Sequence, residues 1–382
     1  MVPEARTTPL TDADGPPLRR ALELAEGGRG RVSPNPLVGA VVVRDGEVVG
    51  EGFHAQLGDV HAEVAALRDS RARGHDPNGA TLYVSLEPCA HQGRQPPCTE
   101  AILDAGIARV VIASDDPSEK ASGRGPGILR DEGVEVVFAE GAEAAAARLL
   151  NQPFRKHART GRPQVTLKSA LSLDGRTATG SGDSRWISGV ESRALVHRWR
   201  AEVDAVAVGI GTALADDPLL TVRDVADPAP RQPARVVFDS SARLPLDSQL
   251  VRSTDVATLT SIVSTEAPAE RVTALRDAGA DVIAVPGDRA QRVSAALAVL
   301  GRHGITSLLL EGGAELAGSF LDAGEVDELR LFIAPVVLGG EGSRPLAAGE
   351  GAKGVDAATR ALAMDWERSG DDLLIQARLR EW

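Results

Sequence analysis

Four residues of this chain have the types and the spacing that hydrolytic metal chemistry requires: His61, Glu63, Cys89 and Cys98. Zinc in proteins favours imidazole and thiolate ligands in a tetrahedron, and a catalytic zinc ion keeps one of the four positions for water. One histidine and two cysteines would supply three protein ligands and leave that position open. Water bound in this way loses a proton near neutral pH, and Glu63 is well placed beside His61 to carry that proton.

The order of these residues follows the pattern of zinc nucleobase deaminases, His-x-Glu and then Pro-Cys-x-x-Cys. Each cysteine follows a proline, and the chain has no other cysteine, but eight residues separate Cys89 from Cys98 where the pattern has two. The alternative is that both thiols are buried apolar side chains and that His61 is a surface histidine. His54 and His91 are further imidazoles nearby that could serve as ligands. The joint occurrence of the residues favours a zinc site with Glu63 as the catalytic acid and base.

Composition and charge limit the kinds of molecule and compartment that we expect for this protein. The chain has 382 residues, a formal net charge of −12 and a sequence pI near 5.2. Nucleic-acid binding depends largely on basic residues, so we expect no nucleic-acid partner. The first 17 residues lack the basic start and apolar core of an export signal, and no apolar run reaches the ~18 residues of a membrane span. We therefore expect a cytoplasmic protein with reduced thiols that does not contact a membrane.

Hydrophobic patterning predicts two α/β domains. We expect a disordered tail over residues 1–17, a first domain over 18–145, a linker helix over 146–160 and a second domain over 161–382. Asp45-Gly46 between two apolar runs predicts a hairpin, and a helix is expected to begin at His61. Strands then alternate with helices through both domains.

Three segments of the first domain resemble one enzyme family. They read SPNPLVG over 33–39, HAEV over 61–64 and LEPCAHQGRQPPC over 86–98, and they are similar to the bifunctional deaminase–reductases of riboflavin biosynthesis. The resemblance covers about residues 18–380. The family usually has asparagine where this chain has Ser33, and a longer Asp-Pro-Asn-Pro stretch at Asp116-Pro117. These departures affect secondary substrate contacts and leave the zinc residues intact.

The second domain offers glycine, aspartate and serine in loops, which alone would indicate ordinary turns. Gly209-Ile210-Gly211 lacks the third glycine of a dinucleotide loop, because Leu214 stands there. Glu311-Gly312-Gly313 follows an apolar strand and precedes a helix expected at Ala314, so its backbone amides could bind a phosphate. The order of these segments resembles the reductase half of the same family.

The resemblance implies a cytidine-deaminase-like three-layer α/β domain followed by a dihydrofolate-reductase-like α/β domain. It implies one Zn²⁺ per chain, NADPH as the second cofactor and a phosphorylated pyrimidine as substrate. It also allows a homo-oligomer formed through the reductase domain. The implied substrate contacts are Asn35, Lys168, Ser184, Arg200, Leu220, Arg223 and Glu311. The implied cofactor contacts are Ala170, Trp186, Thr212, Asp216, Ser240 and Gly313.

The implied reaction removes ammonia from 2,5-diamino-6-ribosylamino-4(3H)-pyrimidinone 5′-phosphate and then reduces the ribosyl group to ribityl with NADPH. Arg200 and Arg223 would clamp the phosphate through charge-assisted hydrogen bonds. Asp216 and Glu311 are candidates for the acid of the reduction. A rival interpretation is a zinc nucleoside or tRNA-base deaminase with an unrelated accessory domain. Two others are a non-catalytic protein with structural zinc and a chain in which only one half is active.

Overall fold

The computed structural model describes residues 10–93, 95–119, 121–226 and 231–382 of the chain. It divides the chain into two compact units, residues 1–160 together with Trp382, and residues 161–381. Most of the expected disordered tail, residues 1–9, lies outside the described residues. No helix in the described part of the chain has both the length and the apolar character needed to cross a bilayer.

A five-stranded sheet is the middle layer of the first unit, in the order β2-β1-β3-β4-β5. The strands are β1 (Gly39–Arg44), β2 (Glu47–Phe53), β3 (Thr81–Val84), β4 (Arg109–Ile112) and β5 (Glu135–Phe138). β1 pairs antiparallel with both β2 and β3, while β3, β4 and β5 run parallel. Asp45 and Gly46 both have positive φ, 53° and 83°, as the turn between β1 and β2 requires. The expected hairpin is confirmed.

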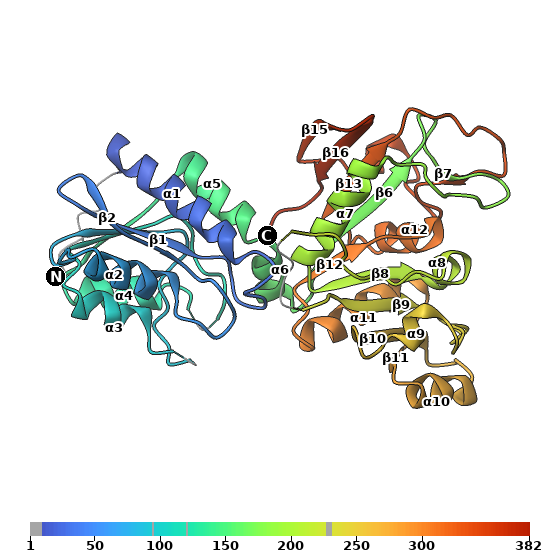
Figure 1. Ribbon diagram of the computed structural model, residues 1–382, viewed down its shortest axis with the longest axis horizontal. Helices are drawn as coiled ribbons and strands as arrows, with labels where there is room; N and C mark the ends of the chain where they lie inside the picture. The colour runs from blue at the N-terminus through green and yellow to red at the C-terminus, as the bar shows by residue number, and fades with distance from the viewer. Residues whose placement is uncertain (1–9, 94, 120, 227–230) are drawn as a thin grey trace. The chain divides into compact units, whose positions relative to one another are not determined.

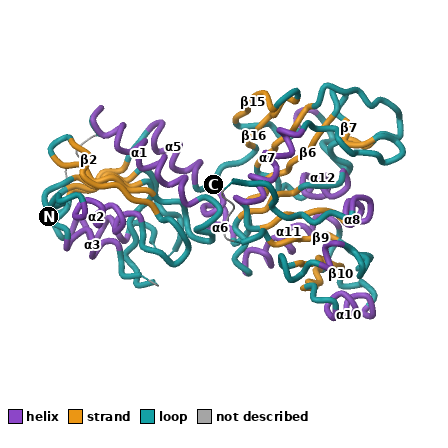
Figure 2. The backbone as a smooth tube through the Cα atoms, viewed as in Figure 1, coloured by secondary structure: helices purple, strands orange, loops and turns teal. Residues whose placement is uncertain are grey.

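Helices cover both faces of this sheet (Figures 1 and 2). They are α1 (Gly15–Ala25), α2 (Ala62–Ala72), α3 (Cys98–Asp104), α4 (Arg124–Asp131) and α5 (Gly141–Leu150), and α6 (Gln152–Thr160) follows α5. Alternate strand residues point to opposite faces, so Val41 packs with α1 and α5 while Val42 packs with α2, α3 and α4. The three-layer α/β architecture expected for the first domain is confirmed.

The ordered chain begins earlier than the sequence indicated. A 3₁₀ turn, Asp12–Asp14, leads directly into α1, which begins at Gly15 and not at residue 18. Asp14 is buried, and its carboxylate accepts hydrogen bonds from Arg109 at 2.6 Å and from the Tyr83 hydroxyl at 2.8 Å. These bonds order a stretch whose composition is typical of a tail. The prediction of a disordered tail is therefore wrong for residues 12–17.

The second unit contains a nine-stranded sheet in the order β11-β10-β9-β8-β12-β6-β13-β16-β15. Its strands are β6 (Gln164–Leu171), β8 (Ala205–Gly209), β9 (Ala234–Phe238), β10 (Leu259–Ser264), β11 (Asp281–Val285), β12 (Ser307–Leu310), β13 (Glu328–Ile333), β15 (Ala363–Ser369) and β16 (Asp372–Arg378). The strands from β11 to β13 are parallel, and β16 and β15 are antiparallel to their neighbours. A separate two-stranded sheet joins β7 (Arg176–Ala178) to β14 (Arg344–Pro345).

Helices cover both faces of the large sheet as well. One hydrophobic core contains α7 (Val190–Glu202), α8 (Ile210–Asp216), α9 (Gln249–Arg252) and α10 (Ala269–Asp277), and the other contains α11 (Arg289–Arg302) and α12 (Ala314–Asp322). In a parallel sheet of this kind, loops at the carboxyl ends of the strands form the ligand site. The loops after the neighbouring strands β8, β9 and β12 are therefore candidates for a ligand site.

Glycine at 52 allows β2 and α2 to pack closely. A Cβ atom at this position would lie 2.3 Å from the backbone nitrogen of Ala66, too close for either backbone to remain in place. We expect Gly52→Ala to destabilise the first unit by about 1–3 kcal/mol, the usual cost of overpacking. Scanning calorimetry of the full chain measures this change.

Gly127→Ala is the matched control, because it lies within α4 and a Cβ there meets nothing within 4 Å. Alanine is the better helix former, so the control should stabilise by about 0.5–1 kcal/mol. Equal effects of the two substitutions would contradict the close-packing argument.

Candidate functional site

The four residues singled out in the first domain lie together where two helices begin. His61 is the residue before α2, Glu63 is in the first turn of α2, Cys98 is the first residue of α3, and Cys89 follows β3. The candidate ligand atoms of His61, Cys89 and Cys98 all lie within 4.8 Å of one another. His61 Nδ1 is 3.1 Å from Cys98 Sγ and 3.5 Å from Cys89 Sγ. One imidazole and two sulfurs at these distances form the donor set that zinc prefers.

Electrostatics at this cluster favour a thiolate and a proton-carrying glutamate. Hydrogen bonds from Cys98 and His61 lower the pKa of the Cys89 thiol to about 4, although burial opposes the shift. The Cys98 backbone N–H also donates to Cys89 Sγ at 3.3 Å. Burial, reinforced by the negative charge of Cys89, raises the pKa of Glu63 to about 7. A carboxyl group with such a pKa can both accept and release a proton near neutral pH.

The additional imidazoles do not belong to the cluster. The Nδ1 atom of His54 is 3.2 Å from the Val60 carbonyl, and its Nε2 atom is 3.1 Å from the Asn35 side-chain nitrogen. Burial lowers the pKa of His54, so a neutral ring would donate through Nδ1 and accept from Asn35. His91 is exposed, and the cluster within the described chain comprises three ligands only. His54 therefore orients Asn35, an implied substrate contact, and the ring centres of His54 and His61 are 5.6 Å apart.

In the second unit, three of the implied substrate contacts form a partly buried charged cluster. Arg200, on α7, donates to both carboxylate oxygens of Glu311, from Nε at 2.6 Å and from Nη2 at 2.9 Å. Burial raises the pKa of Glu311, but the charge and hydrogen bonds of Arg200 outweigh burial, so the net pKa lies below its ordinary value. Burial lowers the pKa of Lys168, which lies on β6 close to Glu311. Glu311 is thus an ionised partner of two cations, which argues against it as the acid of the reduction.

The Arg200 guanidinium differs from the free phosphate clamp that the sequence suggested. Its third nitrogen donates to the Thr221 carbonyl oxygen at 3.1 Å, so every nitrogen of the group has a protein partner. Arg223 is exposed, and its Nη1 contacts only the Thr221 hydroxyl, at 3.3 Å, among the hydrogen bonds found for its side chain in the described chain. Arg223 is the better placed of the pair to meet a phosphate.

Three of the implied cofactor contacts line one cavity. Thr212, Ser240 and Gly313 surround a space of about 720 Å³ at the carboxyl ends of β8, β9 and β12. Gly313 has φ of 74°, and a Cβ atom at Gly312 would lie 2.9 Å from the Thr212 hydroxyl oxygen. The two glycines therefore let the loop after β12 approach α8. Ala170, Trp186 and Asp216 do not line this cavity, and Trp186 is 75% exposed.

Sequence reasoning missed the arginines of the same cavity. Its lining includes Arg243, Arg289, Arg292 and Arg344, which come from three separate segments of the chain. Arg289 and Arg292 open α11 with a spacing of three, which places them on one helix face. That spacing was the available signal, but a basic pair at a helix start is common on solvated surfaces. Ser184 and Leu220 lie in loops, Leu220 buried and with φ of 54°.

Comparison with known proteins supports both halves of this description. Residues 15–114 match the family model "Cytidine and deoxycytidylate deaminase zinc-binding region". Residues 163–375 match the model "RibD C-terminal domain". The riboflavin biosynthesis protein RibD of Actinobacillus pleuropneumoniae is 41% identical over 369 residues, covering 96% of this chain and 95% of that protein.

This chain belongs to the RibD family. RibD of Escherichia coli strain K12 is 42% identical over 337 residues, covering 85% of this chain and 88% of its own length. The solved structure of Acinetobacter baumannii RibD, form 1, superposes with a TM-score of 0.84 at 36% identity, covering 97% of this chain and 99% of that one. A Thermotoga maritima structure titled diaminohydroxyphosphoribosylaminopyrimidine deaminase/5-amino-6-(5-phosphoribosylamino)uracil reductase gives 0.82 at 34% identity, covering 96% and 99%.

Family membership settles the broad function. The chain is a bifunctional deaminase and reductase of riboflavin biosynthesis, with a zinc-binding deaminase domain before a RibD reductase domain. The expected fold class, with its deaminase-like and reductase-like halves, is confirmed. The rival with an unrelated accessory domain is wrong, because the second unit matches the RibD C-terminal domain.

Removing one partner of the largely buried Arg200–Glu311 ion pair should destabilise the second unit. We expect Arg200→Met to destabilise the second unit by about 3–5 kcal/mol, because Glu311 would keep its charge without its main partner. Adding Glu311→Gln should recover part of that loss, since the uncompensated carboxylate is removed. Denaturant unfolding of the two variants measures both effects, and additive losses would show that the pair is not coupled.

Proposed function

We propose that the first unit deaminates 2,5-diamino-6-ribosylamino-4(3H)-pyrimidinone 5′-phosphate and that the second unit reduces the deaminated product with NADPH. The proposal rests on one observation above all, the convergence of the His61, Cys89 and Cys98 ligand atoms within 4.8 Å beside the buried Glu63. The substrate is taken from the family to which the chain belongs. The product would be 5-amino-6-ribitylamino-uracil 5′-phosphate.

His61, Cys89 and Cys98 would hold one zinc ion. The ion, when bound, supplies the Lewis acidity that makes water nucleophilic at neutral pH. Glu63 would carry two protons in turn, the first from that water to the ring nitrogen and the second from the hydroxyl group then on the ring carbon to the departing amino group. Water adds to the ring carbon, the carbon–nitrogen bond breaks, and ammonia leaves. Asn35, fixed by His54, would contact the edge of the pyrimidine.

NADPH would occupy the 720 Å³ cavity of the second unit, against Thr212, Ser240 and Gly313. When bound, it supplies the hydride for C1′ of the ribosylamino group. The cavity arginines supply local positive charge that a chain of net charge −12 otherwise lacks, as a cofactor with several phosphates requires. Lys168 and Glu311 would bind the substrate from β6 and from the loop after β12, and Arg223 would bind its phosphate.

The remaining site residues complete this proposal. Ser184, Arg200 and Leu220 are proposed on the substrate side, and Ala170, Trp186 and Asp216 on the cofactor side. A cytoplasmic location fits a site that depends on two reduced thiols. A homo-oligomer formed through the second unit remains a prediction.

An assay with the diaminopyrimidinone ribosyl phosphate that follows ammonia and NADPH separately tests the deaminase half. The wild-type protein should bind about one zinc per chain and release ammonia without NADPH. Glu63→Gln should keep the zinc but lower kcat for ammonia release by about 100-fold or more, because proton transfer is lost. Cys98→Ser should lose the zinc as well, as elemental analysis would measure. Ammonia release by Glu63→Gln at the wild-type rate would remove Glu63 from its role.

The cofactor half of the proposal is tested through Arg243, which lies on the loop of Ser240 and lines the cavity. Losing one charge-assisted contact to the 2′-phosphate, worth about 1.5–3 kcal/mol, should raise KM for NADPH by roughly 10- to 100-fold. Arg243→Met should leave KM for NADH unchanged. Arg302→Met, an exposed arginine at the end of α11 that does not line the cavity, is the matched control. Equal use of NADPH and NADH by the wild-type protein would contradict the assignment.

A further inference from the structure

Arg155 is a buried arginine outside both matched regions. It lies on α6, and the two family models cover residues 15–114 and 163–375. Only 2% of its surface is exposed. A buried guanidinium is retained only where hydrogen bonds and charge compensate its loss of water. The partners of Arg155 therefore show what this side chain stabilises.

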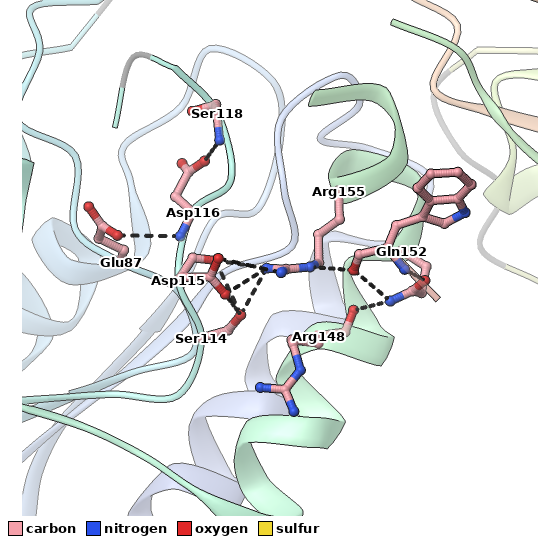
Figure 3. A network of polar contacts seen from close by, with 9 residues as sticks. Glu87, Ser114, Asp115, Asp116, Ser118, Arg148, Gln152 and Arg155 are labelled. Atoms are coloured by element: carbon pink, nitrogen blue, oxygen red, sulfur yellow. Dashed lines mark hydrogen bonds and ion pairs between the residues drawn. The ribbon is translucent and has the colours of Figure 1, made fainter. Parts of the chain in front are cut away.

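The Arg155 guanidinium forms hydrogen bonds with the segment that follows β4 (Figure 3). Its Nη1 atom donates to the Ser114 hydroxyl at 3.1 Å, to the Asp115 carbonyl at 2.9 Å and to the Asp115 carboxylate at 3.1 Å. Its Nη2 atom lies 3.4 Å from the second Asp115 carboxylate oxygen. Its Nε atom donates to the main-chain oxygen of Trp382 at 2.7 Å. One side chain thus fixes both the backbone and the side chains of residues 114 and 115.

The same segment binds the backbone of Glu87 and, together with Gly123, its carboxylate. The Glu87 N–H donates to the Ser114 carbonyl at 3.0 Å. The Glu87 carboxylate accepts from the backbone N–H of Gly123 at 2.6 Å and lies 3.4 Å from that of Asp116. Glu87 is itself 5% exposed, so these bonds satisfy a buried carboxylate.

Glu87 determines the position of the turn that carries a proposed zinc ligand. Pro88 alone separates it from Cys89, and the proline ring fixes one of the two soft backbone angles at that residue. From the other side, Gly125 at the start of α4 approaches so closely that a Cβ there would lie 2.0 Å from the Pro88 oxygen. The turn is therefore held between α4 and the segment after β4.

We infer that Arg155 is a positioning residue of the deaminase site, because it fixes the Ser114–Asp116 segment that holds Glu87 and thereby determines where Cys89 presents its sulfur. The connecting helix α6 is on this account part of the deaminase machinery. The inference rests on the proposed zinc site and adds to it a second set of residues. Partners that orient metal ligands in this way typically contribute about 10- to 100-fold to metal affinity or activity.

The test uses the full-length chain and the substitutions Arg155→Met and Arg155→Lys. Arg148→Met is the matched control, because this arginine is exposed and its side chain points away from the network in Figure 3. Each protein is loaded with Co²⁺ in place of zinc, since cobalt–thiolate absorption reports ligand geometry directly. The zinc-loaded forms are then compared for zinc release to a chelator and for kcat and KM of ammonia release.

We expect Arg155→Met to shift the cobalt spectrum, to speed zinc release by about 10-fold or more and to lower kcat more than it raises KM. Arg155→Lys should lie between Arg155→Met and the wild type, because lysine keeps the charge but cannot reach all the oxygens. Arg148→Met should match the wild type. Reduction of the deaminated substrate by the second unit should be unchanged in all of them, which shows that the loss is not one of general folding.

Glu87→Gln is an independent test of the same inference and replaces Arg155→Met if that variant fails to fold. The amide keeps the size of the side chain but replaces one of its two oxygens with an NH2 donor, which then faces a backbone N–H group of Asp116 or Gly123, so it should shift the cobalt spectrum in the same way. Combined with a tolerated Arg155 variant, its effect should be less than additive, because both act through residues 114–116. Wild-type spectra and zinc release in the variants would overturn the inference. A wild-type protein without bound metal or ammonia release would instead overturn the proposed function.

Discussion

Bringing one imidazole and two thiols within a few ångströms of one another is the constraint on which the deaminase half depends. The ligand atoms come from three separate elements, α2, α3 and the turn after β3, and no local sequence rule holds those elements together. The sheet does so, because β1, β2 and β3 are paired and the helices pack on one of its faces. Two close backbone contacts then fix the helices: Gly52 allows α2 to pack tightly on β2, and Gly125 allows α4 to pack tightly on the turn at Pro88.

Glu63 is placed by the same packing. It lies in the first buried turn of α2, so the helix start that presents His61 also directs the carboxyl group toward the two sulfurs. Burial then raises the pKa of the carboxyl group to about 7, as the proton transfer that we propose for it requires. Carboxyl groups whose pKa is raised by burial are common in catalytic sites, which is consistent with the proposed role of Glu63.

The reductase half solves a different electrostatic problem. The chain is acidic overall, whereas the cofactor and the substrate that we propose for it both carry phosphate. It places arginines around one cavity at the carboxyl ends of the strands, and it neutralises the deeper Arg200 with Glu311. Arg200 is paired with Glu311 and Arg289 with Glu315 at 3.6 Å, so Arg243, Arg292 and Arg344 are the cavity arginines that remain able to bind an anion.

The sequence by itself determined the class of both domains and predicted which side chains would meet in the first one. His61, Glu63 and the two cysteines are recognisable because metal ligation and proton transfer demand particular residue types, and the hairpin at Asp45-Gly46 is a local backbone requirement. Only the tertiary structure decided what depends on partners distant in sequence. Asp14 is ordered by Arg109, Arg200 is paired with Glu311 across 111 residues, and Arg155 binds the segment at 114–115. The sequence does not show which residue a polar side chain will bind, because a residue in a buried ion pair and a residue exposed to solvent have the same identity in sequence.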